Sequence, residues 1–320
     1  MSGPMITNEQ VASVVGYADG AAAARRALRL LHDDAAIEGG RDRFDVGAGR
    51  LLNSMWAASL GDAGSVVTKT YVTGGRSAVR GATLTILLYD APTGELRATL
   101  AGDHVGVLRT AGASVVMAEH LGVSEPETLT VLGTGYQATH HVLAFLQRYG
   151  SIASTRVVAR SEESFRRMRA DLERAGLDPA RMPTPVADAA GAVGESDVVV
   201  TATGASEPVV LGEGLTDGTY LCCVGSNSAA RREIDRAALE RASVVVVDDA
   251  AVAAKEAGDL IRNDWPVEGT TRASDVVGGT AGPPPGGGVR IFESQGLALY
   301  DLVLSETVLE RLGGAEASPG

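Results

Sequence analysis

The chain has 320 residues and carries 28 lysine and arginine residues against 40 aspartate and glutamate residues, a formal net charge of −12. This acidic balance, without a cluster of five or more basic residues, argues against nucleic acid or an anionic membrane as a partner. The N-terminus lacks a basic stretch followed by an apolar core, and no apolar run is long enough to span a membrane. We therefore expect a cytoplasmic protein of two domains.

Two helices are expected in the first part of the chain. Apolar residues recur at helical spacing in residues 9–33, and Gly39 with Gly40 is expected to close that helix. A second helix, rich in small residues, is expected to begin at about Thr110 and to end at Gly122.

Strands are expected between these helices. Residues 65–73 and 82–90 are rich in β-branched side chains, which favour strands. The sequence "APTGE" (91–95) is typical of a hairpin turn, which predicts a further strand in residues 96–100.

From Thr128 onward, short apolar strands alternate with helical segments. This alternation predicts a parallel sheet covered on both faces, as in a Rossmann-like fold. The expected strands are residues 129–133, 155–160, 197–203, 219–225 and 243–249.

The end of the chain is expected to return to the first domain. The glycine- and proline-rich segment 279–290 predicts a loop, followed by a strand "VRIFES" and a helix from about Gly296. The fold class is therefore α/β, a Rossmann-like dinucleotide-binding domain with a discontinuous α+β domain. The expected boundaries are residues 1–122 with 289–320 for substrate binding and dimerisation, and residues 123–288 for NAD(P).

A glycine turn lies directly after the first of the alternating strands. In "VLGTGYQA" (131–138), Gly133 permits a tight turn and Gly135 lets the backbone approach a pyrophosphate at the start of the next helix. The pattern ends in Ala138 and has a strand before it and a helix after it, which is the context that supports dinucleotide binding over a structural turn.

The end of the second strand bears on which dinucleotide is bound. NAD-binding domains usually have an acidic residue there, but this chain has Arg160 and Ser161. Because Arg160 can pair with a 2′-phosphate, NADP(H) is the preferred cofactor. NAD(H) is the alternative, with Glu162 or Glu163 accepting from the ribose hydroxyl.

Two cationic residues of the first domain suggest a carboxylate site. Lys69 shares a strand face with Val67 and Tyr71, where a lone ammonium group requires an anionic partner. Arg109 precedes the small-residue helix and can bind a carboxylate through two hydrogen bonds. The alternatives are an edge-strand lysine and a surface arginine.

The cysteine and histidine residues do not predict a metal site. Cys222 and Cys223 are adjacent, and we expect two buried thiols rather than a vicinal disulfide. His140 and His141 are adjacent on a helix and do not converge on one ion. His104 is expected to be a packed or surface residue, with a catalytic role as the alternative.

Five segments occur in the order found in the ornithine cyclodeaminase/mu-crystallin family, which the chain resembles over about residues 40–305. They are "LRTAGAS" (108–114), "VLGTGYQA" (131–138), "VGSNSAARREID" (224–235), "EAGDL" (256–260) and "FESQGLALYDL" (292–302). The resemblance implies a homodimer in which a hydride passes between a nicotinamide and the α-carbon of a small amino or imino acid.

The resemblance also implies roles for the cations. Lys69 matches the family lysine near the substrate, and Arg109 matches the arginine that binds the α-carboxylate. A further arginine lies upstream of a Met-Pro-Ala motif in the family. The motif here is "MWAA" (55–58), without the proline, and Arg41 fits that upstream position better than Arg43.

The resemblance extends to the cofactor site. Asp301 is expected to support the wall on the nicotinamide side. The expected cofactor contacts are Thr110, Gly133, Gly135, Tyr136, Gln137, Ala138, Arg160, Ser161, Thr201, Ala202, Thr203, Val224, Gly225 and Ser226.

Asn227 separates the candidate reactions. The cyclodeaminase branch has an aspartate there that handles proton transfers, whereas an amide positions a substrate but cannot act as a general base. We therefore expect Asn227 to bind the substrate of an NAD(P)H-dependent reductase acting on a cyclic ketimine carboxylate or an open-chain imine. The alternatives are an ornithine-type cyclodeaminase, an alanine dehydrogenase or opine-type synthase, and a binding protein without catalysis.

Overall fold

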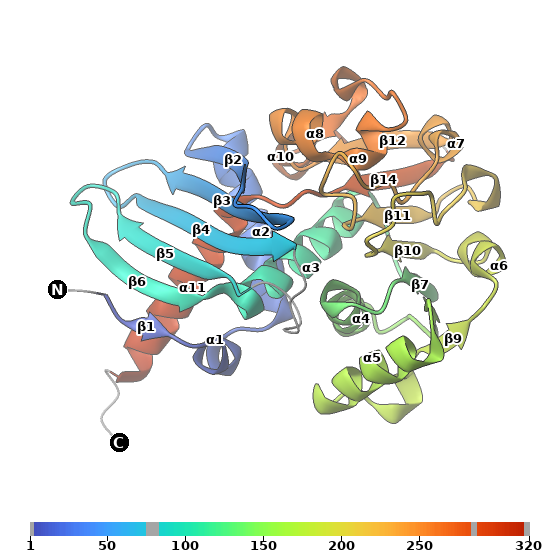
Figure 1. The fold of residues 1–320 in the computed structure, drawn as a ribbon, viewed down its shortest axis with the longest axis horizontal. Coiled ribbons are helices and arrows are strands. Elements are labelled where there is room, and N and C mark those ends of the chain that lie inside the picture. Colours follow the sequence, from blue (N-terminus) through green and yellow to red (C-terminus); the bar gives the residue numbers. More distant parts are fainter. Residues whose placement is uncertain (1–2, 75–82, 283–286, 317–320) are drawn as a thin grey trace. The chain divides into compact units, whose positions relative to one another are not determined.

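The computed structural model describes residues 3–74, 83–282 and 287–316. The chain forms two compact units, which are traced in Figure 1. Unit 1 comprises Met1–Ala113 and Gly296–Gly320, and unit 2 comprises Ser114–Gln295. No helix among the described residues is both long and apolar enough to cross a bilayer.

Unit 1 is built on a six-stranded sheet with the strand order β1-β6-β5-β4-β3-β2. All neighbouring strands are antiparallel except β1 and β6, which are parallel. The strands are β1 (Met5–Ile6), β2 (Ala36–Asp45), β3 (Arg50–Ser59), β4 (Ser65–Gly74), β5 (Thr85–Asp90) and β6 (Leu96–Ala101).

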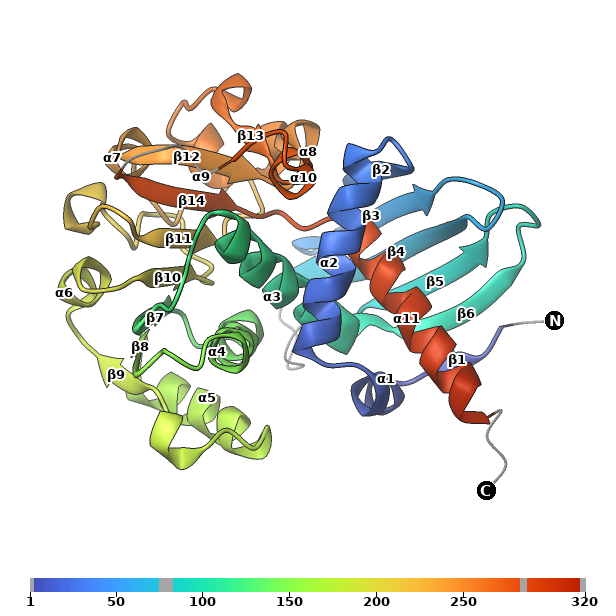
Figure 2. The same ribbon diagram turned by 180° about the vertical axis from the view of Figure 1, so that it is seen from behind.

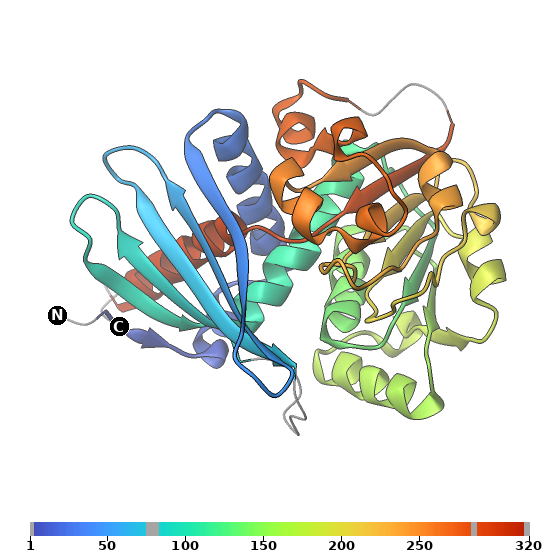
Figure 3. The same ribbon diagram turned by 45° about the horizontal axis from the view of Figure 1, so that its top comes forward.

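Helices cover one face of this sheet. Figure 2 shows α2 and α11 lying across the strands, and Figure 3 shows them behind the sheet from another direction. The covered face contains the buried residues Val67 and Lys69, while alternate residues of β4 are more exposed. The helices are α1 (Asn8–Val14), α2 (Tyr17–His32), α3 (Gly102–His120), which continues into unit 2, and α11 (Ala298–Glu316).

The prediction for residues 9–33 was correct in type but wrong at the helix end. Two helices separated at Val15 and Gly16 replace the single one, and Gly39 and Gly40 lie within β2. The pairing of β2 with β3 shifts register between Glu38 and Arg41, and Gly40 has a φ of 73°, the left-handed region that glycine tolerates. This bulge interrupts the alternation that would have indicated a strand.

The small-residue helix begins earlier than predicted. Helix α3 starts at Gly102, so that Arg109 and Thr110 lie inside it, and Gly122 follows its end with a φ of 80°. A Cβ on Gly112 would lie 2.3 Å from the backbone of Gly20, so the small residues of α3 allow α2 to approach closely.

Unit 2 contains an eight-stranded, fully parallel sheet, which confirms the predicted Rossmann-like fold. The strand order is β13-β12-β14-β11-β10-β7-β8-β9. The strands are β7 (Thr128–Leu132), β8 (Ser154–Val158), β9 (Thr184–Val186), β10 (Val198–Thr201), β11 (Tyr220–Cys223), β12 (Ala242–Val247), β13 (Thr271–Arg272) and β14 (Val289–Glu293).

Helices connect these strands. They are α4 (Tyr136–Arg148), α5 (Glu162–Arg174), α6 (Ala189–Gly194), α7 (Arg236–Glu240), α8 (Ala250–Glu256), α9 (Gly258–Ile261) and α10 (Ala273–Gly278). Part of the loop predicted for residues 279–290 lies outside the described residues. Its described part contains no helix, and the only strand residues in it are the first two of β14.

The assignment of residues 289–293 to the first domain was wrong. Strand β14 pairs with β11 on one side and β12 on the other, in the middle of the unit 2 sheet. Val289, Ile291 and Phe292 are fully buried, as is typical of an inner parallel strand with both faces covered. The following helix, α11, belongs to unit 1, whereas residues 114–122, which the prediction placed in the first domain, belong to unit 2.

Candidate active site

Lys69 is the centre of a buried charge cluster in unit 1. Its side chain is 1% exposed on the helix-covered face of β4, and its ammonium group contacts the carboxylate of Asp301 in the first turn of α11. A buried ammonium group is costly without such a partner. The sequence had placed Asp301 in a supporting wall, so its role as counter-ion of Lys69 was not predicted.

Arg109 joins the same cluster from α3. Its Nε lies 3.3 Å from Oδ1 of Asp301, within ion-pair distance but without hydrogen-bond alignment, and the side chain is 9% exposed. Burial and the positive charge of Arg109 together lower the pKa of Lys69 to about 8, against the opposing effect of Asp301. Two cations and one anion leave one positive charge that a bound carboxylate can neutralise.

Arg41 lies on the same row of the sheet as Lys69. Arg41 pairs with Met55 across β2 and β3, and Met55 pairs with Lys69 across β3 and β4. The Nε of Arg41 donates to the Met55 sulfur at 3.3 Å, and the charge of Arg41 also lowers the pKa of Lys69. Arg43 is opposite Asn53, two rows away on the same face, so Arg41 is the nearer of the two arginines to Lys69 along the sheet.

Glu38 was missed by the sequence analysis. Its carboxylate accepts hydrogen bonds from the backbone N–H groups of Ala298 at 3.2 Å and Leu299 at 3.0 Å, and thereby caps the helix that carries Asp301. Burial raises the pKa of Glu38 to about 7. No local signal identifies this cap, because the donors lie 260 and 261 residues away along the chain.

The glycine turn of unit 2 has the geometry of an anion site. Gly133 has a φ of 116°, and a Cβ there would lie 2.5 Å from the carbonyl oxygen of Ala202. Gly135 precedes α4 without a side-chain cap, and a Cβ on it would meet open space. The first N–H groups of this helix are therefore available to a phosphate, and the turn fits a dinucleotide.

The end of the second strand carries the residues expected to select the cofactor. Arg160 is exposed two residues beyond the end of β8, and Ser161 caps α5 by accepting a hydrogen bond from the Ser164 N–H at 3.2 Å. Glu162 and Glu163 lie in the first turn of α5. They are 3.8 Å and 2.7 Å from the guanidinium groups of Arg166 and Arg167.

Glu233, which the sequence analysis did not select, brings several predicted cofactor residues together. Its carboxylate accepts from the hydroxyl of Thr201 at 2.8 Å, from the N–H and hydroxyl of Thr203 at 2.6 Å each, and from the Gly225 N–H at 2.8 Å. The Ala202 N–H donates to the carbonyl of Leu132 at the end of β7. Glu233 thus joins the loops after β10 and β11, beside the glycine turn.

Asn227 lies in the loop after β11. Its side-chain oxygen accepts a hydrogen bond from Arg231 at 3.3 Å, and Arg231 also donates to the carbonyl of Gly225 at 3.1 Å. The preceding residue, Ser226, donates its hydroxyl proton to Glu293 at 2.5 Å. The amide therefore lies on a loop held by neighbouring hydrogen bonds.

The two cysteines and His141 are buried, and His104 is half-buried. Cys222 and Cys223 are free and buried, which confirms the expected thiols. His141 is buried between Ser114, 2.9 Å from Nε2, and the carbonyl of Gln137, 2.8 Å from Nδ1. Burial lowers the pKa of His141 to about 4, as expected for a packed residue. His104 is half-buried within α3.

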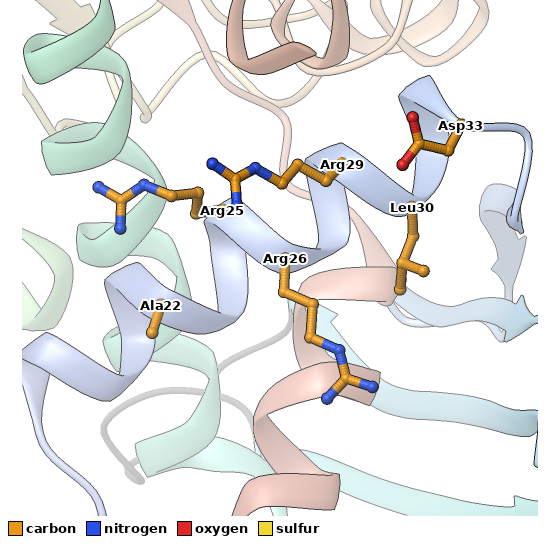
Figure 4. A pocket seen from close by; sticks show the side chains of 6 residues that line it. All are labelled: Ala22, Arg25, Arg26, Arg29, Leu30 and Asp33. Atoms are coloured by element: carbon orange, nitrogen blue, oxygen red, sulfur yellow. The ribbon is translucent and has the colours of Figure 1, made fainter.

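A surface depression on α2 belongs neither to the charge cluster of Lys69 nor to the loops joined by Glu233. It has a volume of about 390 Å³, and Figure 4 shows its arginine side chains extending from one helix. Arg26 is 3.8 Å from Glu306 of α11. The lining residues are Ala22, Arg25, Arg26, Arg29, Leu30 and Asp33.

The parallel sheet, the glycine turn and the loops beside it define unit 2 as a Rossmann-like domain suited to a dinucleotide. Residues 44–316 match the ornithine cyclodeaminase/mu-crystallin family, and the chain belongs to this family, as the resemblance implied.

Relatives and a solved structure agree with this membership. The chain is 32% identical to a Delta(1)-pyrroline-2-carboxylate reductase of Bacillus cereus, over 71% of this chain and 70% of that protein. It is 34% identical to a Delta(1)-pyrroline-2-carboxylate/Delta(1)-piperideine-2-carboxylate reductase of Azospirillum brasilense, over 72% and 71%. A Thermococcus litoralis Delta(1)-pyrroline-2-carboxylate reductase, solved with NADH and L-proline, has the same fold with a TM-score of 0.89. It is 21% identical, and 99% of each chain is covered.

Proposed function

We propose that this protein is an NAD(P)H-dependent reductase of a cyclic α-imino acid, of the pyrroline- or piperideine-2-carboxylate type. The observation that carries the proposal is the buried cluster of Lys69, Arg109 and Asp301, with its one excess positive charge. The names of the Bacillus and Azospirillum relatives support the substrate class.

The substrate carboxylate would be bound by the cations of unit 1. Arg109 offers a planar guanidinium suited to two parallel hydrogen bonds, and Lys69 offers a compact charge. Arg41 lies on the same sheet row as Lys69 and would complete the set. Because Lys69 and Arg109 are buried, their attraction for a carboxylate is stronger than it would be in water.

The cofactor would be held by unit 2, with its pyrophosphate at Gly133, Gly135 and the start of α4. When bound, a reduced nicotinamide supplies a hydride. In the reduction, the imine carbon accepts the hydride and the imine nitrogen accepts a proton. Lys69 suits the role of proton donor, because a pKa of about 8 keeps it protonated near neutral pH yet able to release the proton.

Asn227 favours reduction over cyclodeamination. Cyclisation of a diamino acid needs a base that removes a proton from the attacking amine, and an amide cannot do this. Reduction needs only that Asn227 bind the substrate by hydrogen bonds.

Cofactor oxidation tests the proposal directly. The purified protein is incubated with NADPH or NADH and with pyrroline-2-carboxylate, piperideine-2-carboxylate, or pyruvate plus ammonia, and absorbance of the reduced cofactor is followed. We expect turnover with a cyclic imino acid. Ammonia from ornithine plus NAD⁺, without oxidation of NADPH or NADH by any imine, would contradict the proposal.

NADPH is the proposed preferred cofactor because of Arg160. Replacing Arg160 by alanine is expected to raise the KM for NADPH about 10- to 100-fold, since a charge-assisted hydrogen bond contributes about 1.5–3 kcal/mol. The KM for NADH should stay within about twofold. Arg174→Ala, which removes another exposed arginine of unit 2, is the control. Equal changes for both cofactors would exclude 2′-phosphate recognition by Arg160.

The open face of the unit 1 sheet supports a homodimer. Opposite the face that carries Lys69, four large apolar side chains are 42–54% exposed on neighbouring strands, which is unusual for the free surface of a monomer. They are Ile37, Phe44, Trp56 and Val72.

Trp56→Glu is expected to convert the dimer to a monomer, because a carboxylate within an apolar interface would lose its hydration. Sedimentation equilibrium measures the mass. Leu211→Glu, at an exposed leucine of unit 2, should leave the dimer unchanged. A monomeric wild-type protein, or a Trp56→Glu variant that stays dimeric, would contradict this interface.

A further inference from the structure

Unit 2 buries several carboxyl groups more deeply than any of its described cations. Five of them are less than 9% exposed, whereas no lysine or arginine among the described residues of this unit is buried to that extent. Burial raises the pKa of three of them, Glu233, Asp259 and Glu293. The five residues are Glu233, Asp248, Glu256, Asp259 and Glu293.

Two of these carboxyl groups meet at the carboxyl ends of the strands. Glu293 ends β14, Asp259 lies in α9, and Cys223 ends β11. Each contributes one polar atom to a group in which all atoms lie within 4.8 Å of one another. Oε2 of Glu293 and Oδ2 of Asp259 are buried and have no hydrogen-bond partner as ionised oxygens. A shared proton would satisfy both atoms at once.

The other hydrogen bonds indicate which residue holds the proton. Oδ1 of Asp259 accepts from the N–H groups of Glu233 at 2.6 Å and Ile234 at 2.9 Å, and two backbone donors favour an ionised carboxylate. Oε1 of Glu293 accepts from Ser226 at 2.5 Å and from the Gln295 amide at 3.1 Å, leaving Oε2 for the proton.

We propose that Glu293 is a neutral carboxylic acid in the folded protein at neutral pH, and that its Oε2–H donates to Asp259. In this form Glu293 is a positioning residue: it holds Ser226, and with it the loop that continues into Asn227. Its effect on catalysis rests on the proposed function, whereas the protonation itself does not.

The groups around Glu293 all favour the neutral form. Burial and the charge of Asp259 raise its pKa well above the ordinary value, and Glu233 acts in the same direction. Cys223 faces it from β11, and burial raises the pKa of this thiol, which therefore stays neutral. Asp248, at the end of β12, accepts from Ser294, the residue after Glu293. All of these groups are acidic or neutral.

Infrared spectroscopy tests the protonation without substrate or cofactor. A neutral carboxylic acid has a carbonyl stretch that is separate from those of ionised carboxylates and shifts in D₂O. We expect absorption of this kind at neutral pH in the wild-type protein, and we expect Glu293→Gln to lose one component of it. Glu38 and Glu233, whose pKa values are raised to about 7, also contribute and should be unchanged. The full absorption should remain in the control variant Glu162→Gln, which changes an exposed glutamate of the same unit.

The pH dependence of folding gives a second test. The folded protein holds a proton that the unfolded chain releases above the ordinary pKa of 4.5, so stability falls as pH rises through and above that value. For each unit that the pH rises above this value, the ratio of folded to unfolded molecules should fall by an additional factor of about ten in the wild-type protein compared with Glu293→Gln. Equal slopes for the two proteins would contradict a retained proton.

Binding distinguishes a positioning role from packing. Glutamine can imitate the neutral acid, with its amide donating to Asp259 and its oxygen accepting from Ser226, whereas leucine can do neither. We expect Glu293→Gln to bind NADPH within about threefold of the wild type and Glu293→Leu to bind at least about tenfold more weakly. Equal binding by both variants would contradict positioning by Glu293.

Metal analysis of the purified protein tests whether a divalent cation, instead of a proton, lies between Glu293 and Asp259. A divalent cation at one per chain, lost in Glu293→Gln, would overturn the shared proton. If the wild-type protein binds neither NADPH nor NADH, the proposed function fails, while the infrared band and the folding slope still decide the protonation.

Discussion

Replacement of Asp301 by asparagine is expected to lower the free energy of unfolding by about 3–5 kcal/mol, because breaking a buried ion pair leaves uncompensated charge. Asparagine keeps the size of the side chain but removes the only anion that contacts Lys69 and Arg109 among the described residues. The pKa of Lys69, already lowered to about 8, should fall further. Urea unfolding, followed by circular dichroism, measures the stability.

Tryptophan fluorescence helps to show which unit loses stability in Asp301→Asn, since Trp56 lies in unit 1 and Trp265 lies in unit 2. Asp62→Asn, which changes an exposed aspartate of unit 1, is the matched control and should alter stability by less than about 0.5 kcal/mol. A loss of less than about 1 kcal/mol in Asp301→Asn would mean that water reaches this cluster and screens it.

Replacement of Arg109 by methionine is expected to lower kcat/KM for the imino acid at least about 100-fold. The variant loses two charge-assisted hydrogen bonds to the substrate carboxylate, each contributing about 1.5–3 kcal/mol. Lys69 and Asp301 should remain paired, so the protein should fold. Steady-state kinetics with the preferred imino acid and saturating cofactor measure this loss.

Arg109→Lys separates charge from geometry. Lysine keeps the positive charge but cannot form two parallel hydrogen bonds, so we expect kcat/KM between those of the wild type and Arg109→Met. Arg97→Met is the matched control, because Arg97 belongs to unit 1 and donates to Ser65 instead of joining the charge cluster. A kcat/KM in Arg109→Met within about threefold of the wild type would exclude carboxylate binding by Arg109.

The elements that were predicted well depend on local chemistry. The glycine turn was identifiable because Gly133 and Gly135 stand between an apolar strand and an amphipathic helix. The hairpin formed by β5 and β6 followed from β-branched residues around a Thr-Gly turn. In these cases, the residues that decide the structure lie within a few positions of one another.

The elements that were missed or misplaced depend on distant contacts. Strand β2 was hidden by a bulge at Gly40, whose need for a partner strand appears only when β3 lies beside it. Strand β14 was assigned to the wrong unit because its apolar residues suit a buried position in either sheet. Its place between β11 and β12 is fixed by hydrogen bonds to strands that lie far earlier in the chain.

The sequence by itself determined the parallel sheet and its glycine turn, and it predicted that Lys69 needs an anionic partner and that Arg109 can bind a carboxylate. Alternation, capping and turn chemistry are properties of neighbouring residues, so they can be recognised before the fold is known. Only the tertiary structure decided the partners: Asp301 for the two cations, Glu38 for the start of α11, and Glu233 for the loops of unit 2. Burial makes these partners necessary, and burial arises only when segments far apart in the chain pack together.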